Sequence, residues 1–347
     1  MIIGNRHIAP HSPVLVIAEL GVNHDGSVER ALHLVKIAKR CGADAVKLQV
    51  FQANQLMHES SQFAEYQKHT VLDSDPVAML KRYELDEISL KKIVDTIHAA
   101  GMLAVATPFS PGDVGTIDRI GVDVIKVASP DAVNRLLLQR VAQLGRPIIV
   151  STGASTLDEI HMCCDWLRGW KASFSLLHCI SSYPAPAEST NLCWIRELQQ
   201  ECGVTVGFSD HSTEVVSGAL AVAAGATIVE RHLTYAHNAD GPDHAASSDP
   251  GEFSHYVRLV RQAEKMIGSP GKRVLAIEQD VRQVSRQSLV CCRDLRAGEM
   301  IGPDDLTVQR PGTGIPAAMI ENTVGKIIRR AVKAGSMLQW DMLGEAA

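Results

Sequence analysis

The sequence of 347 residues lacks features that mark several other classes of protein. No apolar run approaches the roughly 20 residues that a membrane span needs. The formal charge of -5 provides no basic surface for nucleic acid. The segment MIIGNRHIAPHSP has no charged region followed by an apolar core, so we expect no secretory signal. A cytoplasmic protein that binds small molecules or other subunits, and neither nucleic acid nor membrane, is expected.

Nucleotide-binding and disulfide signatures are also missing. Neither a GxGxxG nor a GxxxxGK loop occurs, which argues against a doubly wound nucleotide-binding sheet. The 8 cysteines contain no CxxC pair and lie mostly in apolar patterns, so they are interpreted as buried thiols. The hydrophobic content of 46% is enough for one large globular domain and a small one.

Apolar runs and helical patterns alternate from the N-terminus to about residue 268. Such alternation over about 250 residues favours a (β/α)8 TIM barrel, whose active site lies at the carboxyl ends of its strands. The strands are expected at residues 14–20, 45–51, 103–107, 122–128, 148–152, 174–179, 204–208 and 227–232.

Composition divides the chain into three parts. We expect the catalytic barrel over residues 1–268, a polar linker over 269–286 and a small β-rich domain over 287–347. A segment of about 60 residues is small for independent stability, so the last domain is expected to dock on another surface. The long connection 52–86 is interpreted as a lid, with a peripheral helical insertion as the alternative.

Two histidines mark the predicted site. His211 and His232 each follow a short β-type run, and the apolar segment between them predicts a helix of about four turns. Adjacent strands lie about 4.8 Å apart, so the two imidazoles can share one divalent metal such as Mn, Co, Fe or Zn. The alternative is that both are ordinary polar residues.

Cations and hydroxyl groups are expected at the same rim. Two lysines and several serines at strand ends suit a phosphate or a phosphorylated carboxylate, because they offer positive charge and hydrogen-bond donors. Structural salt bridges of the lysines with Glu19 are the alternative. His178 is equally a hydrogen-bonded core residue, and His24 a local turn residue. The rim set is Lys47, Lys126, Ser129, Ser151 and Ser209.

Motifs at these strand ends support a more specific interpretation. The order AELGVNHDG, KLQ, TPF, KVAS, STGAS, HCISSYPAP, GFSDHS, ERH and GPDHAAS resembles the sialic acid synthase family. That family condenses phosphoenolpyruvate with an N-acyl hexosamine to give a nine-carbon keto acid. The tail QSLVCCRDLRAGEMIGPDDLTVQRPGTGIP resembles the family's antifreeze-like SAF domain, a β-clip fold.

The resemblance implies a role for each matching position. His211 and His232 would bind Mn²⁺, or another divalent ion such as Mg²⁺ or Co²⁺. The rim lysines and serines would bind phosphoenolpyruvate, and Arg310 would enter the barrel of the partner in a domain-swapped homodimer. The catalytic residues implied are Glu19, Lys47, Lys126 and Tyr183, and the sugar-binding residues are Gln49, Asp131, Tyr183, Asp243 and Arg310.

Two departures from the family pattern leave the sugar open. Asp131 stands where a glutamate is frequent and Ser181 where an asparagine is frequent, and both are expected to face the sugar. A sugar of the legionaminic or pseudaminic acid branches, or one without nitrogen, fits as well as an N-acetylhexosamine. The alternatives in function are a related 3-deoxy keto-sugar acid synthase, a metal-dependent aldolase, or a non-catalytic sugar-binding homologue.

Overall fold

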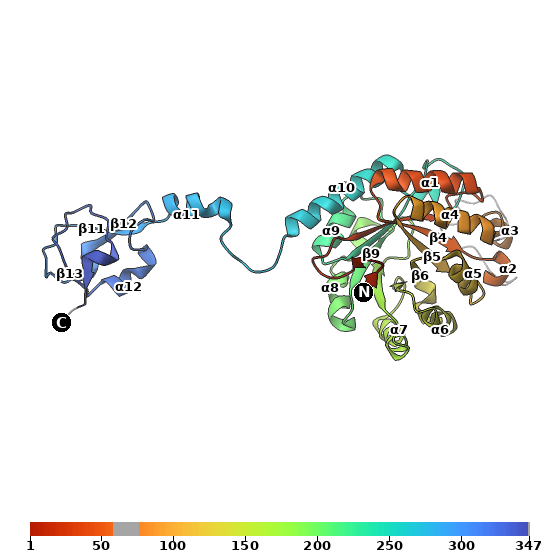
Figure 1. Ribbon diagram of the computed structural model, residues 1–347, viewed down its shortest axis with the longest axis horizontal. Helices are drawn as coiled ribbons and strands as arrows, with labels where there is room; N and C mark the ends of the chain where they lie inside the picture. The colour runs from red at the N-terminus through yellow and green to blue at the C-terminus, as the bar shows by residue number, and fades with distance from the viewer. Residues whose placement is uncertain (58–75, 346–347) are drawn as a thin grey trace. The chain divides into compact units, whose positions relative to one another are not determined.

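The computed structural model describes residues 1–57 and 76–345, and within them eight parallel strands close into a barrel (Figure 1). Each strand pairs with the next along the chain, and β10 closes the ring by pairing with β3. The predicted TIM barrel is therefore confirmed. The strands are β3 Leu15–Gly21, β4 Ala45–Val50, β5 Leu103–Pro108, β6 Val124–Val127, β7 Ile148–Ser151, β8 Phe174–Cys179, β9 Val206–Asp210 and β10 Ile228–His232.

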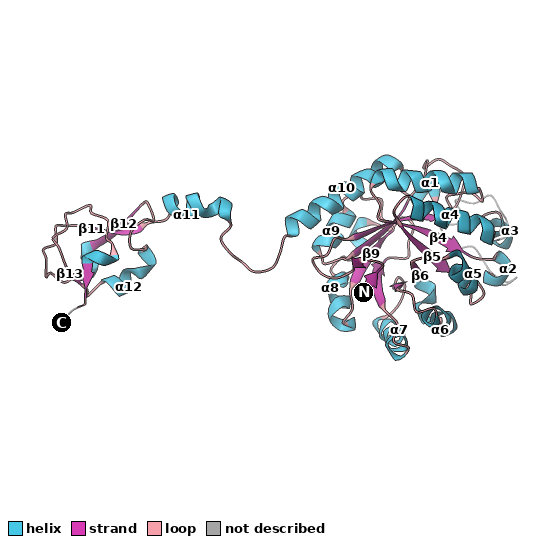
Figure 2. Cartoon of the chain, in the orientation of Figure 1, coloured by secondary structure: helices cyan, strands magenta, loops and turns pink. Residues whose placement is uncertain are grey.

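Helices surround the barrel on its outer side (Figure 2). Side-chain caps begin several of them: Ser27 accepts from the Arg30 amide at α1, and Thr156 forms a capping box with Glu159 at α7. Within the described residues, no helix has the length and apolar character to cross a membrane. The principal helices are α1 Val28–Cys41, α4 Glu87–Ala99, α5 Asp113–Ile120, α6 Arg135–Gln143, α7 Leu157–Gly169, α8 Trp194–Cys202, α9 Ser217–Ala223 and α10 Pro250–Ile267.

The helix between the two histidines is shorter than expected. We predicted about four turns, but α9 has only 7 residues. The reason lies in the preceding segment, where the Asp210 carboxylate accepts hydrogen bonds from the amide and hydroxyl of Ser212 and from the hydroxyl of Ser217. These local side-chain bonds compete with helical hydrogen bonds and delay the start of α9.

The barrel interior changes from apolar to polar along its axis. Its amino-terminal half is closed by an unpredicted hairpin, β1 Ile2–Ile3 and β2 Arg6–His7. Ile3, in β1, and Ile8, which follows β2, share one buried cluster with inward residues of seven strands, including Leu15, Val124 and Leu177. Because inward positions recur at every second residue, the next inward layer toward the carboxyl ends consists of polar side chains. The predicted functional residues belong to this upper layer.

The predicted lid falls in part on residues 58–75, which lie outside the described residues. On either side of them are the short helices α2 Ala53–Leu56 and α3 Pro76–Lys81. Met79 and Tyr83 pack with Val22 and Phe51 in a small buried cluster. The returning part of this connection is therefore anchored on the segments that follow β3 and β4.

The chain divides into two compact units, Met1–Ser269 and Pro270–Ala347. The second unit contains two antiparallel strand pairs, β11 Ser288–Cys291 with β12 Leu306–Gln309 and β13 Ile327–Ile328 with β14 Leu343–Gly344. Its apolar core includes Leu289, Ile301 and Leu338. The segment expected as a polar linker contains the helix α11 Gln279–Ser285, and α12 Ile320–Thr323 follows β12.

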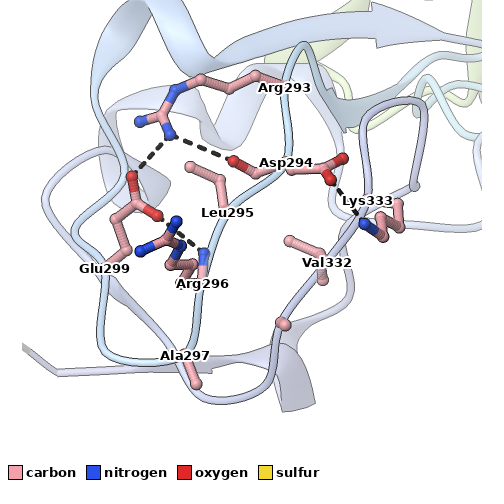
Figure 3. A pocket seen from close by; sticks show the side chains of 9 residues that line it. Arg293, Asp294, Leu295, Arg296, Ala297, Glu299, Val332 and Lys333 are labelled. Atoms are coloured by element: carbon pink, nitrogen blue, oxygen red, sulfur yellow. Dashed lines mark hydrogen bonds and ion pairs between the residues drawn. The ribbon is translucent and has the colours of Figure 1, made fainter.

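A surface pocket of about 830 Å³ lies in the second unit (Figure 3). Two of its cations are held by carboxylates of the same unit: Arg293 pairs with Asp305 and Glu299, and Lys333 pairs with Asp294. None of the predicted site residues lines this pocket. These ion pairs serve the local structure of the unit.

Candidate active site

Four buried charges meet at the carboxyl ends of β3, β4, β6 and β10. The ammonium of Lys47 forms ion pairs with Glu19 and, at 2.8 Å, with Oε1 of Glu230. The ammonium of Lys126 lies 3.9 Å from the same Glu230 oxygen and donates a 2.6 Å hydrogen bond to Ser151 Oγ. The ammonium of Lys47 is therefore salt-bridged, whereas the closest hydrogen-bond partners of the Lys126 ammonium are neutral oxygens. Its charge is the less compensated of the two.

Burial and charge shift the pKa values of this set. Burial lowers the pKa of Lys47 to about 8, although Glu230 opposes that change. Burial alone would raise the pKa of Glu230, but Lys126 and Lys47 outweigh it and hold that pKa well below its usual range. Glu230 therefore remains ionised between the lysines. Perturbed groups gathered in this way are typical of a functional site.

The two predicted histidines are close together. The ring centroids of His211 and His232 are 5.9 Å apart. Nδ1 of His211 donates to the carbonyl oxygen of Ile180 at 2.7 Å, so the lone pair of the unprotonated ring lies on Nε2. Burial would lower the pKa of this ring, but hydrogen bonding to Cys179 raises it. In the described residues, Nδ1 of His232 is buried without a hydrogen-bond partner. Burial lowers the pKa of His232 well below its usual value, so this ring is neutral.

Carboxylates lie beside these imidazoles, at the point where Gly21 has a φ of 51°. A Cβ on Gly21 would lie 2.9 Å from Asp243 Oδ2, 3.4 Å from Glu19 Oε1 and 3.4 Å from Cε1 of His232. Asp243 Oδ2 is 3.8 Å from Nδ1 of His232. Two imidazoles with adjacent carboxylate oxygens fit a divalent ion, because such mixed nitrogen and oxygen sets suit several of these metals.

One other group of close ligand-type side chains occurs among the described residues: His237, Asp249 and Glu252, whose ligand atoms all lie within 4.8 Å of one another. All three side chains are about two-fifths exposed, at 43%, 40% and 42%. Asp249 and Glu252 also form the capping box that begins α10. Their position is thus explained by the helix terminus, and the pair His211 and His232 remains the better candidate.

The predicted serines lie among these groups. Ser209 Oγ donates to Glu230 Oε1 at 3.0 Å, and Ser129 Oγ accepts from the Gly153 amide at 3.0 Å. A Cβ on Gly153 would come within 2.3 Å of Ser181 Oγ, so glycine is needed there. Ser181 Oγ and Ser129 Oγ therefore both lie beside Gly153, and the contact of Ser181 with the sugar stays a prediction.

The predicted sugar-binding residues are gathered only in part. The Tyr183 ring stacks on His211 with centroids 4.1 Å apart, and it meets His232 edge-on. Gln49 is half-buried two positions after Lys47 in β4. Asp131 accepts a 2.9 Å hydrogen bond from Asn134, and burial raises its pKa. Arg310 is exposed in the second unit.

Sequence reasoning missed Glu230 and Cys179. Glu230 precedes His232 by two positions in one strand, so the alternation of a strand puts both on the inner face, and this signal was available. Cys179 ends β8 with its sulfur 3.9 Å from Nδ1 of His211 and 3.4 Å from Ser129 Oγ. Burial would raise the pKa of this thiol, but hydrogen bonding to His211 lowers it to about 7.

The two other histidines have local partners. His178 is buried, stacks on Phe208 and bonds the carbonyl of Thr190 at 2.7 Å, which favours its interpretation as a core residue. His24 accepts a 3.1 Å hydrogen bond from the Gly26 amide. Burial lowers the pKa of His24 to about 4.

Comparison with known proteins agrees with this geometry. Residues 34–272 match the NeuB family and residues 286–344 match the SAF domain. The N,N'-diacetyllegionaminic acid synthase of Legionella pneumophila is 36% identical over 332 residues, which cover 94% of this chain and 93% of that protein. The N-acetylneuraminate-9-phosphate synthase of Homo sapiens is 30% identical, over 97% of this chain and 95% of that protein.

A solved structure extends the likeness to the fold. The N-acetylneuraminic acid (sialic acid) synthetase of Leptospira borgpetersenii, crystallised with citrate, has a TM-score of 0.74 and 31% identity, covering 81% of this chain and 94% of that one. The family match spans more than half of the chain, and the relatives align with it over nearly their whole length. The chain therefore belongs to the NeuB family and carries a C-terminal SAF domain.

Proposed function

We propose that this protein condenses phosphoenolpyruvate with an N-acyl hexosamine similar to N-acetylmannosamine, forming a sialic acid-type nonulosonic acid and releasing phosphate. The observation that carries the proposal is the pair of buried lysines, Lys47 and Lys126, beside the two histidines. A buried ammonium is costly without an anion, and the carboxylate oxygen nearest to Lys126 is 3.9 Å away and is shared with Lys47. The names of the relatives, synthases of legionaminic acid and of N-acetylneuraminate-9-phosphate, supply the reaction class.

The metal assignment is part of the same proposal. His211 and His232 hold Mn²⁺, or Mg²⁺ or Co²⁺ in its place, with the carboxylates of Glu19 and Asp243 nearby. When bound, such an ion supplies Lewis-acid polarisation for the aldehyde oxygen of the open-chain sugar.

The side chains of the barrel divide the remaining work. Lys47, Lys126 and the rim serines hold the phosphate and carboxylate of phosphoenolpyruvate through charge-assisted hydrogen bonds. C3 of phosphoenolpyruvate bonds to the aldehyde carbon, water adds at C2, and phosphate leaves by cleavage of the C–O bond. Glu19 acts as the general acid/base residue for the proton transfers in these steps. Tyr183 stacks on His211 and, with Gln49 and the other sugar-binding residues, faces the acceptor.

A substrate panel tests this function. The protein is incubated with phosphoenolpyruvate labelled with ¹⁸O at the enol oxygen, and with 2-acylamino hexoses, a 2,4-diacetamido hexose, neutral hexoses or aldose phosphates. We expect sugar-dependent release of phosphate that carries the label, because C–O cleavage leaves the enol oxygen on phosphorus. Turnover with aldose phosphates alone indicates a 3-deoxy sugar acid synthase, and pyruvate-dependent condensation indicates an aldolase. Sugar binding without any turnover supports the non-catalytic alternative.

We further propose a domain-swapped homodimer in which Arg310 of one chain serves the barrel of the other. Inactive Arg310→Ala and inactive Glu19→Ala chains, co-refolded, are then expected to regain activity. The reason is that each heterodimer contains one barrel with an intact Glu19 that receives an intact Arg310. Phosphate release by purified heterodimers carrying two different tags measures the recovery.

The matched control combines Glu19→Ala with Lys47→Met, since both defects lie in the barrel and every site of that heterodimer is defective. Recovery in the first pair and none in the second supports the swap. Equal activity of the two heterodimers contradicts it.

A further inference from the structure

A buried ion pair lies on the outer side of the barrel wall, directly behind the two histidines. Strands β9 and β10 pair in parallel with Arg231 opposite Asp210, and each of these residues immediately precedes a histidine. Because strand side chains alternate, both point away from the inward layer and toward the helices. Nη1 of Arg231 is 2.7 Å from Oδ2 of Asp210, with side chains 4% and 0% exposed.

Asp210 fixes the chain on both sides of His211. Its Oδ1 accepts hydrogen bonds of 2.9 Å from the Ser212 amide and 2.7 Å from the Ser212 hydroxyl. This carboxylate therefore closes a turn across His211. The carbonyl of His211 accepts a further 2.9 Å bond from the Ala185 amide. The backbone from which the imidazole projects is thus held at both ends.

Arg231 performs the equivalent task at His232. Its Nε donates to Ser248 Oγ at 2.5 Å, and the Ser248 amide donates to the carbonyl of His232 at 2.9 Å. Nη1 also donates to the carbonyl of Glu214 at 3.0 Å, and the guanidinium lies 4.8 Å from the ring centroid of Tyr256. These hydrogen bonds connect the guanidinium to Ser248, which bonds the backbone of His232, and to Glu214, which follows His211 closely in the chain.

We infer that Asp210 and Arg231 form a positioning pair that couples the backbones of His211 and His232 and so sets the separation of the two imidazoles. The pair touches neither ring. A buried ion pair is weak evidence for a role in stability, because hydrophobic residues in its place often stabilise the fold equally well. Groups that support metal ligands from behind, in contrast, commonly change the affinity for the metal. The consequence for metal affinity rests on the proposed metal site; the coupling of the two backbones does not.

The test uses Asp210→Asn, which keeps an oxygen for Ser212 but removes the charge that Arg231 contacts, together with Arg231→Lys and the double variant. Calorimetric titration with Mn²⁺ alone is expected to show an affinity reduced roughly 10- to 100-fold in each single variant. The double variant should bind Mn²⁺ no more weakly than the single variant with the lower affinity, because the two residues act as a unit. Imidazole NMR signals of the metal-free protein at one fixed pH should shift for both histidines in each variant.

The matched control is Asp44→Asn. Asp44 pairs with Arg6 at 2.9 Å and with Arg261, and its Oδ2 accepts from the Val16 amide at 2.8 Å near the start of β3. Its loss should reduce the free energy of unfolding without changing Mn²⁺ affinity or the signals of the two histidines. A purely structural role for Asp210 would give that same result.

The outcomes test the coupling of the two backbones separately from its effect on metal affinity. If the Asp210 variants keep wild-type Mn²⁺ affinity and unshifted histidine signals, the coupling is overturned, whatever their stability. If the wild-type protein binds no Mn²⁺, the metal assignment fails, and the histidine signals alone decide the coupling. Should Asp210→Asn fail to fold by circular dichroism, Ser248→Ala takes its place, because it removes only the hydroxyl that Arg231 contacts.

Discussion

Replacing His211 or His232 with alanine is expected to abolish turnover and metal content together. Each ring offers one nitrogen from a separate strand, and the ring centroids are 5.9 Å apart. Loss of either leaves a single imidazole, so the affinity should fall by more than the roughly 100-fold typical of losing a group that merely supports a ligand. Elemental analysis after dialysis against Mn²⁺, combined with sugar-dependent phosphate release, measures both quantities on the same sample.

His178→Ala is the control for this pair of variants. His178 is also a buried histidine at the carboxyl end of a barrel strand, but it bonds the carbonyl of Thr190 and stacks on Phe208. Its removal should lower the unfolding temperature while the metal content remains. Full turnover by a metal-free protein lacking both His211 and His232 would contradict the assignment.

The barrel was predictable because its strands are buried on both faces. Runs such as Ile148–Ser151 are buried throughout, and the helices between them end at glycines with left-handed φ such as Gly42. Strand ends were less certain: β9 continues to Asp210, two residues beyond the prediction, because Ser209 and Asp210, residue types common in turns, pair with β10 here. The hairpin Ile2–His7 was missed, since two-residue strands are too short to show a period.

The site was predictable where a residue's place depends on its strand alone. Lys47, Lys126, Ser151 and His232 follow from strand register, and the structure gathers them as expected. Glu230 follows the same strand register. It was missed because ERH was treated as one motif, although its first and third side chains share the inner face of the strand.

Loop residues needed the structure. The contact of Tyr183 with His211 and that of Ser181 with Gly153 both arise in the turn after β8, where no periodicity fixes the direction of a side chain. Asp131 lies in a 3₁₀ turn, Ser129–Val133, and its hydrogen bond to Asn134 was equally beyond sequence patterns.

Catalytic efficiency with phosphoenolpyruvate is expected to fall as the pH rises above about 8, because Lys47 then loses its proton. Burial lowers the pKa of this ammonium from 10.5 to about 8. A group with that pKa is charged below pH 8 and neutral above it. Its charge-assisted bond to the anionic substrate is therefore present at lower pH and is lost as the pH rises through about 8. The pH profile of kcat/KM, which reports the free enzyme, measures the change.

Two substitutions at this position separate charge from shape. Lys47→Arg should remove the alkaline decline, because a guanidinium stays protonated throughout this range. Lys47→Met should lower kcat/KM at every pH by about 10- to 150-fold, which corresponds to the roughly 1.5–3 kcal/mol of one charge-assisted hydrogen bond. Lys36→Met, at an exposed position of α1, should leave the profile unchanged. If Lys47→Arg keeps the wild-type decline, a different group titrates there, and the anion does not depend on the Lys47 ammonium.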